Sequence, residues 1–382
     1  MTLNANWSYP TAIRFGAGRI SEIVDACNIA GIRKPLLVTD RGLAGKHITS
    51  ITLDWLELAG FGRPIFAKVD PNPNEHNVKE GLRAYYEGGY DGVIAFGGGS
   101  GLDLGKTIAF MAGQTRSLWD FEDIGDWWTR ANPDAIAPIV AVPTTAGTGS
   151  EVGRASVITN SSTKEKKIIF HPKMLPSVVI CDPELTVGMP QPITAGTGMD
   201  AFAHCLEAYC SPHYHPMSQG IALEGMRLVK EYLPRAYADG RDLEARSHMM
   251  SAAMMGATAF QKGLGAIHAL SHPIGAHHNT HHGTTNAVVM QNVLEFNRPK
   301  IRTLIKHVAS YLGIKGGFNG FVRFVGELNS QLEIPENLTR LGVRFPDMDQ
   351  LVMDALKDPS TGGNPVEMTE KNTRVLLEAC FE

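Results

Sequence analysis

The segment GVIAFGGGSGLDLGKTIAF, residues 92–110, decides the fold of this 382-residue chain. Its first half is a short apolar run, as in a strand that is covered on both faces, and its second half has the composition of a helix. A turn of three glycines, residues 97–99, and Ser100 separates the two halves. Glycine also ends strands for conformational reasons alone. Free N–H groups at the start of such a helix, however, are well suited to bind phosphate.

Other strands of the same kind are visible in the first half of the chain. Each is a short apolar run that ends in Gly, Asp, Pro or Thr, as strands do when they lead into a ligand-facing loop. They are KPLLVTD (34–40), APIVAVPTT (137–145) and PSVVICDPE (176–184). Segments with helical spacing, such as 21–32 and 75–90, would supply the crossover connections of a parallel sheet.

The second half of the chain has a different pattern. After DPELTVGMP no strand is indicated, and Ala, Leu, Met and Glu recur at intervals of three and four residues. The clearest helical segments are 191–211, 216–239 and 243–263. We therefore predict an α/β domain over residues 1–184 and an all-helical domain over residues 185–382.

The composition argues against several classes of protein. Charged residues make up 19% of the chain and the net charge is −4, with no run of Lys and Arg, so nothing indicates a nucleic-acid partner. No apolar run approaches the about 20 residues of a membrane-crossing helix, and no signal-peptide pattern is visible. The five cysteines are scattered and never spaced Cys-x-x-Cys, which argues against disulfides and a thiolate zinc site. We expect a cytoplasmic protein without a membrane partner.

Polar groups follow the predicted strands at positions where a cofactor would bind. Asp40 ends one strand, where a carboxylate can accept hydrogen bonds from a ribose, although it could equally cap the turn that follows. The loop PTTAGTGSE, 143–151, offers the hydroxyls of Thr144, Thr145 and Thr148, which are also typical of a capped turn. Two such loops at the carboxyl edge of one sheet favour a nucleotide cofactor.

Histidines concentrate in one stretch of the second half. Residues 265–287, GAIHALSHPIGAHHNTHHGTTNA, contain six of the fourteen histidines in the chain. His268 and His272 are four residues apart, so a helix would place them on one face. Pro273 comes directly after, and we expect the helix to kink or restart there, so that the second histidine need not point where the first does.

A second pair of possible metal ligands lies in GMDAFAHCLEAY. Asp200 and His204 are four residues apart and would share one helix face. His281 and His282 lie in the turn-like segment NTHHGTT, from which an imidazole could return to the same centre. One Asp with three His suits tetrahedral Fe(II) or Zn(II) rather than Mg or Ca. Any single histidine here could also be an ordinary core or surface residue.

Taken together, these motifs resemble the iron-containing (group III) alcohol dehydrogenase family. The resemblance is carried by FGGGSGLDLGK, PTTAGTGSE, DPELT, GMDAFAHCLEAY, GLGAIHALSHPIGA and NTHHGTTNAVV, in this order along the chain. It implies a Rossmann-like N-terminal domain that binds NAD and a helical C-terminal domain that binds the metal, with both ligands in the cleft between them. It also implies a homodimer or a larger homo-oligomer.

The resemblance further implies roles for single residues. The metal ligands that it implies are Asp200, His204, His268 and His282. His272 matches a histidine that is not a ligand but lies near the substrate and the nicotinamide. The cofactor positions that it implies are Asp40 at the adenosine ribose, Gly98, Gly99 and Ser100 at the pyrophosphate, Lys167 beside the nicotinamide ribose, and Asn72, Asp103, Thr144, Thr145 and Thr148 elsewhere along the dinucleotide.

The reaction expected from this set is hydride transfer between an alcohol and NAD, with the metal as a Lewis acid and His272 as the proton relay. Asp40 would repel the 2′-phosphate of NADP, which favours NAD. The substrate stays open between a linear alcohol or diol and, if Lys262 and Arg154 line the pocket, a hydroxy acid or semialdehyde. A non-redox lyase resembling dehydroquinate synthase, which shares this scaffold, is the remote alternative.

Overall fold

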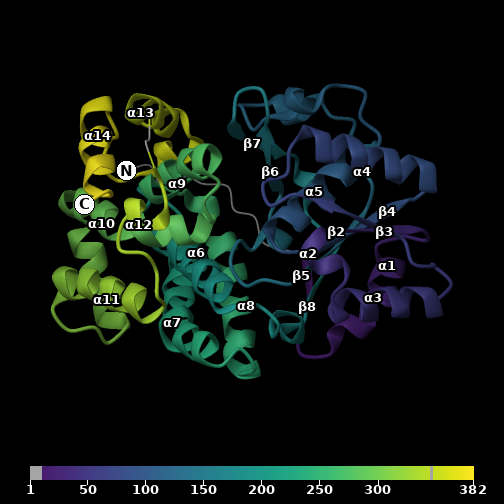
Figure 1. The fold of residues 1–382 in the computed structure, drawn as a ribbon, viewed down its shortest axis with the longest axis horizontal. Coiled ribbons are helices and arrows are strands. Elements are labelled where there is room, and N and C mark those ends of the chain that lie inside the picture. Colours follow the sequence, from purple (N-terminus) through teal and green to yellow (C-terminus); the bar gives the residue numbers. More distant parts are fainter. Residues whose placement is uncertain (1–10, 345–346) are drawn as a thin grey trace. The chain divides into compact units, whose positions relative to one another are not determined.

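The protein, described here from a computed structural model that covers residues 11–344 and 347–382, divides into two compact units. The α/β unit comprises residues 11–145 and 149–187 (Figure 1). The helical unit comprises residues 146–148 and the described residues from 188 onward. The predicted fold class, a parallel α/β unit followed by an all-helical unit, is confirmed.

A six-stranded parallel sheet forms the centre of the α/β unit, in the order β1-β8-β5-β4-β2-β3. Its strands are β1 (Ala12–Phe15), β2 (Pro35–Asp40), β3 (Ile65–Val69), β4 (Gly92–Gly97), β5 (Ile139–Pro143) and β8 (Val178–Cys181). The four predicted strands are the four inner ones. The edge strands β1 and β3 were not predicted, because each is partly exposed and lacks a continuous apolar run.

Helices cover both faces of this sheet, which explains why its inner strands are buried and mostly apolar, with Thr39 and Asp40 as the polar residues of β2. The helices of the unit are α1 (Ile23–Ile29), α2 (Arg41–Ala44), α3 (His47–Leu58), α4 (Glu75–Gly88) and α5 (Gly99–Met111). Alternate strand residues such as Ile94 and Val140 pack with α1 and α3 in one core. On the other face, α5 lies so close to β4 that a Cβ on Gly105 would come within 2.6 Å of the Cβ of Ala95.

The order of the strands reverses between β2 and β4. The chain passes from β2 outward to the edge strand β3 and returns to β4 on the opposite side of β2. In open parallel sheets, ligands bind at the carboxyl ends of the strands where the order reverses in this way. Asp40 at the end of β2 and the glycine turn after β4 lie at this position.

A two-stranded antiparallel hairpin, which was not predicted, completes the described strands of the α/β unit. It is formed by β6 (Ala155–Asn160) and β7 (Glu165–Phe170). Both strands are mixed in polarity and only partly buried, so neither has the apolar run that marks the inner strands of the large sheet.

The helical unit contains no strand among its described residues. Its helices are α6 (Gln191–Cys210), α7 (Pro216–Ala238), α8 (Leu243–Ala259), α9 (Ala266–His278), α10 (His282–Tyr311), α11 (Gly317–Gln331), α12 (Leu338–Leu341), α13 (Met348–Lys357) and α14 (Glu370–Ala379) (Figure 1). Helix α6 is buried almost all round from Thr194 to Cys210, which is typical of the central helix of a bundle. None of the described helices combines the length and the apolar composition that a membrane crossing requires.

Two local expectations about the histidine-rich stretch differ in part from the structure. Helix α9 continues through Pro273 instead of restarting there, since it packs along α10 and α13 and this packing outweighs the about 3 kcal/mol that an interior proline costs. The segment NTHHGTT is only partly a turn, since residues 279–281 connect α9 with α10 and the rest of the segment is the start of α10. His281 is the N-cap, its Nδ1 lies 3.3 Å from the N–H of Thr284, and His282 is the first helical residue.

Candidate metal centre and cofactor loops

Three helices of the helical unit bring four predicted ligands to one place. Asp200 and His204 lie one turn apart on α6, His268 lies near the start of α9, and His282 opens α10. Asp200, His204 and His268 are 2%, 5% and 1% exposed, and a ligand atom from each lies within 4.8 Å of those of the other two. The fourth side chain, His282, is partly exposed.

The distances within this cluster are those of ligands around a cation rather than of hydrogen-bonded partners. The Nε2 atoms of His204, His268 and His282 lie 3.8, 3.7 and 3.5 Å from Oδ1 of Asp200. These separations are too long for hydrogen bonds. They are close to the edge of a tetrahedron with metal–ligand bonds of about 2.1 Å, which is about 3.4 Å. The nitrogen-rich donor set with one carboxylate therefore fits a first-row divalent metal.

The protonation of two ligands supports the same interpretation. Burial alone would raise the pKa of Asp200, but the surrounding imidazoles of His204, His282 and His268 hold it well below its ordinary range. Burial lowers the pKa of His204 to about 4. An ionised carboxylate and a neutral imidazole are the forms that bind a metal. Burial also disfavours the charged form of His268, but Glu207 and Asp200 together raise its pKa to about 9.

His272 lies beside the cluster but points its Nδ1 elsewhere. This nitrogen is 2.8 Å from Oδ2 of Asp358, and the ring stacks on that of His282 with centroids 5.2 Å apart. Burial would raise the pKa of Asp358, but His272 and the N–H of Ser360 lower it, so the carboxylate stays ionised. An ionised carboxylate can only accept, so Nδ1 of His272 carries the proton and Nε2 is left as a potential base.

Three polar residues of this site were missed by the sequence analysis. Glu207 lies 2.5 Å from Nδ1 of His268, and Asn286 donates from Nδ2 to Oδ1 of Asp200 at 2.8 Å. Helical spacing could have found both, because Glu207 is three residues after His204 and Asn286 is four residues after His282. The third is Asp358, and no local signal connects it with His272, 86 residues earlier.

The predicted cofactor residues of the α/β unit gather at the carboxyl ends of β2, β4 and β5. Gly97 has a φ of 144°, which residues with a side chain rarely adopt, and a Cβ there would lie 3.8 Å from Oδ2 of Asp40. A Cβ on Gly98 would come within 3.1 Å of Thr145, and the N–H of Thr144 donates to the carbonyl of Gly97 at 2.9 Å. Backbone and hydroxyl groups of three loops are thus in contact.

Asp40 and Ser100 also have structural partners within these loops. Oδ1 of Asp40 accepts from the N–H of Leu43 at 2.9 Å, so the capping role considered from the sequence is present. Its Oδ2 has no such bond to α2 and faces the glycine turn. The hydroxyl of Ser100 donates to the carbonyl of Pro71 at 2.5 Å, which brings the loop with Asn72 to the start of α5.

Three other predicted cofactor residues lie in different surroundings. Asp103 accepts from the Ser150 hydroxyl at 2.5 Å and from the N–H of Val157 at 2.9 Å, so its carboxylate holds the chain around the hairpin. Lys167 on β7 pairs with Glu122 at 3.1 Å and with Glu165, two residues earlier on the same strand, at 3.0 Å. Thr148 belongs to the short segment 146–148 that groups with the helical unit.

Lys262, which was considered as a partner for a carboxylated substrate, is buried. Its Nζ donates to the carbonyl of Tyr209 at 2.9 Å, at the C-terminal end of α6, where a cation is favourable. Burial lowers its pKa to about 8. Arg154, the other cation considered, lies with its guanidinium 5.4 Å from the ring of Phe170. Both cations thus have partners within the protein, so neither contact indicates a carboxylated substrate.

Two family models match this chain, and together they span nearly all of it. The model described as iron-containing alcohol dehydrogenase matches residues 10–183. The model described as the C-terminal part of the Fe-containing alcohol dehydrogenase family matches residues 194–381.

Individual relatives are similar over their whole length. A 4-hydroxybutyrate dehydrogenase from Cupriavidus necator is 39% identical, over 97% of this chain and 98% of its own. An NAD-dependent methanol dehydrogenase from Bacillus methanolicus is 33% identical, over 98% of this chain and 99% of its own. Among solved structures, a 1,3-propanediol oxidoreductase matches with a TM-score of 0.93 and 35% identity, over 99% of this chain and 100% of the other.

Proposed function

Because this chain belongs to the iron-containing alcohol dehydrogenase family, we propose that it is a metal-dependent enzyme that transfers a hydride between an alcohol and NAD. The resemblance predicted from the motifs is confirmed by both family models. The lyase alternative is not carried further, since both halves of the chain match dehydrogenase models.

One observation carries the proposal. Three imidazole nitrogens face a single buried carboxylate oxygen at 3.5 to 3.8 Å, which is longer than an ordinary hydrogen bond. Acceptors that face one another in a buried space repel unless a cation lies among them. Asp200, His204, His268 and His282 are therefore the residues that we assign to hold the metal.

The metal would supply a Lewis acid for the substrate oxygen, and the protein would handle the proton. His272 is the residue that we assign to this step, because Asp358 holds its Nδ1 as a donor and leaves Nε2 free to take the proton of the substrate hydroxyl. Asp358 also remains ionised, so it stabilises the imidazolium that forms.

We propose Fe(II) as the metal, with Zn(II) as the alternative, since imidazoles with one carboxylate suit both. For the cofactor we propose NAD rather than NADP. Asp40 lies at the end of β2, where a ribose would bind, and Oδ2 of this carboxylate faces the glycine turn. A negative charge there would repel a 2′-phosphate. The other proposed cofactor contacts are Asn72, Gly98, Gly99, Ser100, Asp103, Thr144, Thr145, Thr148 and Lys167.

For the substrate we propose a short linear alcohol or diol. A four-carbon hydroxy acid is the second candidate, because a similar relative is a 4-hydroxybutyrate dehydrogenase. The burial of Lys262 and its bond to the carbonyl of Tyr209 remove one argument for a carboxylate in the substrate. We also propose a cytoplasmic homo-oligomer, and the five buried free cysteines agree with a reducing compartment.

The test is a substrate panel on protein purified without oxygen and analysed for metal. Short alcohols and diols, 4-hydroxybutyrate and the corresponding aldehydes would each be offered with NAD or NADH, and NADH absorbance would be followed. We expect metal near one equivalent per chain and turnover with members of the first group. Turnover that survived complete removal of the metal, or no change in NADH with any member of the panel, would contradict the proposal.

A further inference from the structure

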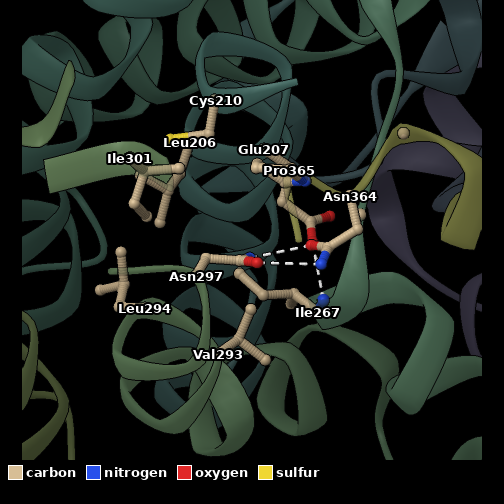
Figure 2. A pocket seen from close by; sticks show the side chains of 12 residues that line it. Leu206, Glu207, Cys210, Ile267, Val293, Leu294, Asn297, Ile301, Asn364 and Pro365 are labelled. Carbon is tan, nitrogen blue, oxygen red and sulfur yellow. Dashed lines mark hydrogen bonds between the residues drawn. The ribbon is translucent and has the colours of Figure 1, made fainter. Parts of the chain in front are cut away.

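Glu207 is a buried carboxylate that faces the metal centre from behind one ligand. It lies on α6, three residues after His204, in a helix that is enclosed on all sides. Its Oε2 is 2.5 Å from Nδ1 of His268, and its Oε1 accepts from the N–H of Ile267 at 2.6 Å. Both carboxylate oxygens are therefore bonded to two consecutive residues at the start of α9, and Figure 2 shows the bond to Ile267.

The start of α9 depends on side chains from elsewhere in the chain. Its N-cap is Gly265, which has no side chain to accept from the first free N–H groups. Asn364 accepts from the N–H of Ala266 at 3.1 Å, and Glu207 accepts from that of Ile267. Asn364 is held in turn by a reciprocal pair of hydrogen bonds with Asn297, visible in Figure 2. Two buried polar groups thus accept from the first two N–H groups of α9, and Glu207 is the one that also bonds His268.

The carboxylate of Glu207 also determines which nitrogen of His268 carries a proton. Because Nδ1 of His268 donates to Oε2 of Glu207, Nε2, which faces Asp200, is the nitrogen that can bind a metal once it carries no proton. A cavity of about 20 Å³ beside Glu207 has room for about one water. The side chains of His268 and Glu207 are 1% and 6% exposed, so bulk water has little access to this hydrogen bond.

The Nδ1 atoms of the other two imidazoles lie in different surroundings. Nδ1 of His282 lies 3.4 Å from the hydroxyl of Ser271, a long and neutral contact. Nδ1 of His204 is buried and has no hydrogen-bond partner among the described residues. His268 is thus the imidazole whose Nδ1 is bonded to a buried carboxylate.

We propose that Glu207 is a positioning residue that sets the tautomer and the orientation of His268 as a metal ligand, while it also caps α9. This inference rests on the proposed metal site and extends it to a residue that does not touch the metal. Carboxylates in this relation to a ligand histidine raise metal affinity by about 10- to 100-fold.

Glu207→Gln is the sharpest test, because the amide is nearly isosteric with the carboxylate. Its oxygen can still accept from the N–H of Ile267, so the cap of α9 is kept. Its NH₂ group would face Nδ1 of His268, which favours the tautomer with the proton on Nε2. We expect metal affinity, measured by chelator competition with Zn(II) or Co(II), to fall about 10- to 100-fold. The visible spectrum of the Co(II)-loaded variant should also change, since the ligand field changes.

Asn364→Ala is the matched control, since it removes the neighbouring cap of α9 and leaves Glu207 on His268. It should lower the melting temperature of the metal-free protein, while its Zn(II) affinity stays within about threefold of that of the natural chain. Glu207→Asp keeps the charge but withdraws it by one methylene. We expect its loss of affinity to be smaller than that of Glu207→Gln, and it carries the test if the Gln variant does not fold.

The outcomes separate the two proposals. If the natural chain binds Zn(II) tightly and Glu207→Gln binds it equally well with the same Co(II) spectrum, the positioning role is wrong and the metal site stands. Equal losses in the Gln and Asp variants would also overturn the role, because charge would then not matter. If the natural chain bound no metal, the proposed function would fail and this inference with it.

Discussion

Both units of the protein bury ionisable side chains, but they satisfy them in opposite ways. In the α/β unit, Lys106 is fully buried on α5. Its Nζ donates to the carbonyls of Ser150 and Ala155 and lies 3.5 Å from Asp103. Each acceptor in this cluster thus faces a donor, and the cluster is complete without a ligand.

In the metal cluster of the helical unit the groups that face one another are almost all acceptors when the imidazoles are neutral. Oδ1 of Asp200 and the Nε2 atoms of the three histidines face one another, and the amide of Asn286 is a donor that approaches them. In their metal-binding forms, a carboxylate and neutral imidazoles, these groups are stabilised by a cation among them. Burial and a shifted pKa occur in both units, so neither identifies a functional site by itself. The balance between donors and acceptors is what distinguishes the two clusters.

Two buried carboxyls show the same contrast. Burial raises the pKa of Glu151, in the α/β unit, to about 7. Asp200 is buried to the same degree, yet its pKa lies well below the ordinary range, because imidazoles surround it. The environment supplied by neighbouring helices, rather than burial itself, decides whether a carboxylate is ready to bind a metal.

The largest expected effect comes from removing one acceptor of the metal cluster. His268→Ala should leave the protein with almost no bound metal. It should also lower kcat/KM at least about a thousandfold, since a Lewis acid stabilises the transition state by several kcal/mol. Metal analysis and NADH formation measure both. His277→Ala, on the same helix but paired with Asp354, is the control. Full activity in a metal-free His268→Ala protein would contradict the assignment of this cluster as a metal site that the reaction needs.

The next largest effect is expected from the complete cluster of the α/β unit. Lys106→Met should lower the free energy of unfolding by about 3 kcal/mol, because it leaves buried carbonyls and Asp103 without their donor. Urea unfolding measures this, and metal content should not change. Lys173→Met, at an exposed lysine, should cost less than about 0.5 kcal/mol. If Lys106→Met lost metal but kept its stability, the Lys106 cluster would have a role in metal binding instead of a structural one.

The buried carboxyl of Glu151 should make the free energy of unfolding depend on pH. In the unfolded chain this carboxyl loses its proton near its ordinary pKa of 4.5, whereas in the folded chain it keeps the proton up to about pH 7. The folded state therefore binds more protons in this interval, and its stability falls as the pH rises through it. Linkage gives a contribution of about 2 kcal/mol lost between about pH 5 and about pH 7.

Glu151→Gln stays neutral and should remove that contribution. Urea unfolding of both proteins at several pH values in this interval measures the difference between their slopes. Glu87→Gln, at an exposed position, should keep the slope of the natural chain. Parallel pH profiles for the natural chain and Glu151→Gln would mean that Glu151 is already ionised in the folded protein.

The smallest expected effect concerns a carboxylate that is neither buried nor fully satisfied. Asp40→Ser keeps an acceptor for the N–H of Leu43 and removes the charge at the end of β2. The ratio of kcat/KM for NADP to that for NAD should rise about tenfold, since repulsion between half-exposed charges is on the order of 1 kcal/mol. Asp54→Ser on the outer surface of α3 is the control. An unchanged ratio would leave Asp40 with its capping role alone.

Periodicity and short motifs were enough to predict much of this molecule. The four inner strands were visible because a strand covered on both faces must be apolar at every position. The pair Asp200 and His204 was visible because helical spacing places them on one face. The edge strands and the hairpin β6–β7 escaped, since half-exposed strands have a mixed composition that is shared with loops.

The restart considered at Pro273 does not occur, for a related reason. A local rule measures the cost of proline in an isolated helix, whereas α9 packs along other helices that stabilise it. His281 and His282 were expected in a turn, but the same residues serve as the cap and first residue of α10.

The sequence by itself determined the family, the fold class and the residue types that can bind a metal, because these depend on composition and on spacing within single elements. Only the tertiary structure decided which groups form hydrogen bonds with these residues. Glu207 on His268, Asp358 on His272 and the carbonyl acceptors around Lys106 come from segments 44 to 86 residues away. Hydrogen bonds between such segments depend on how helices and strands pack, and local patterns carry no information about that.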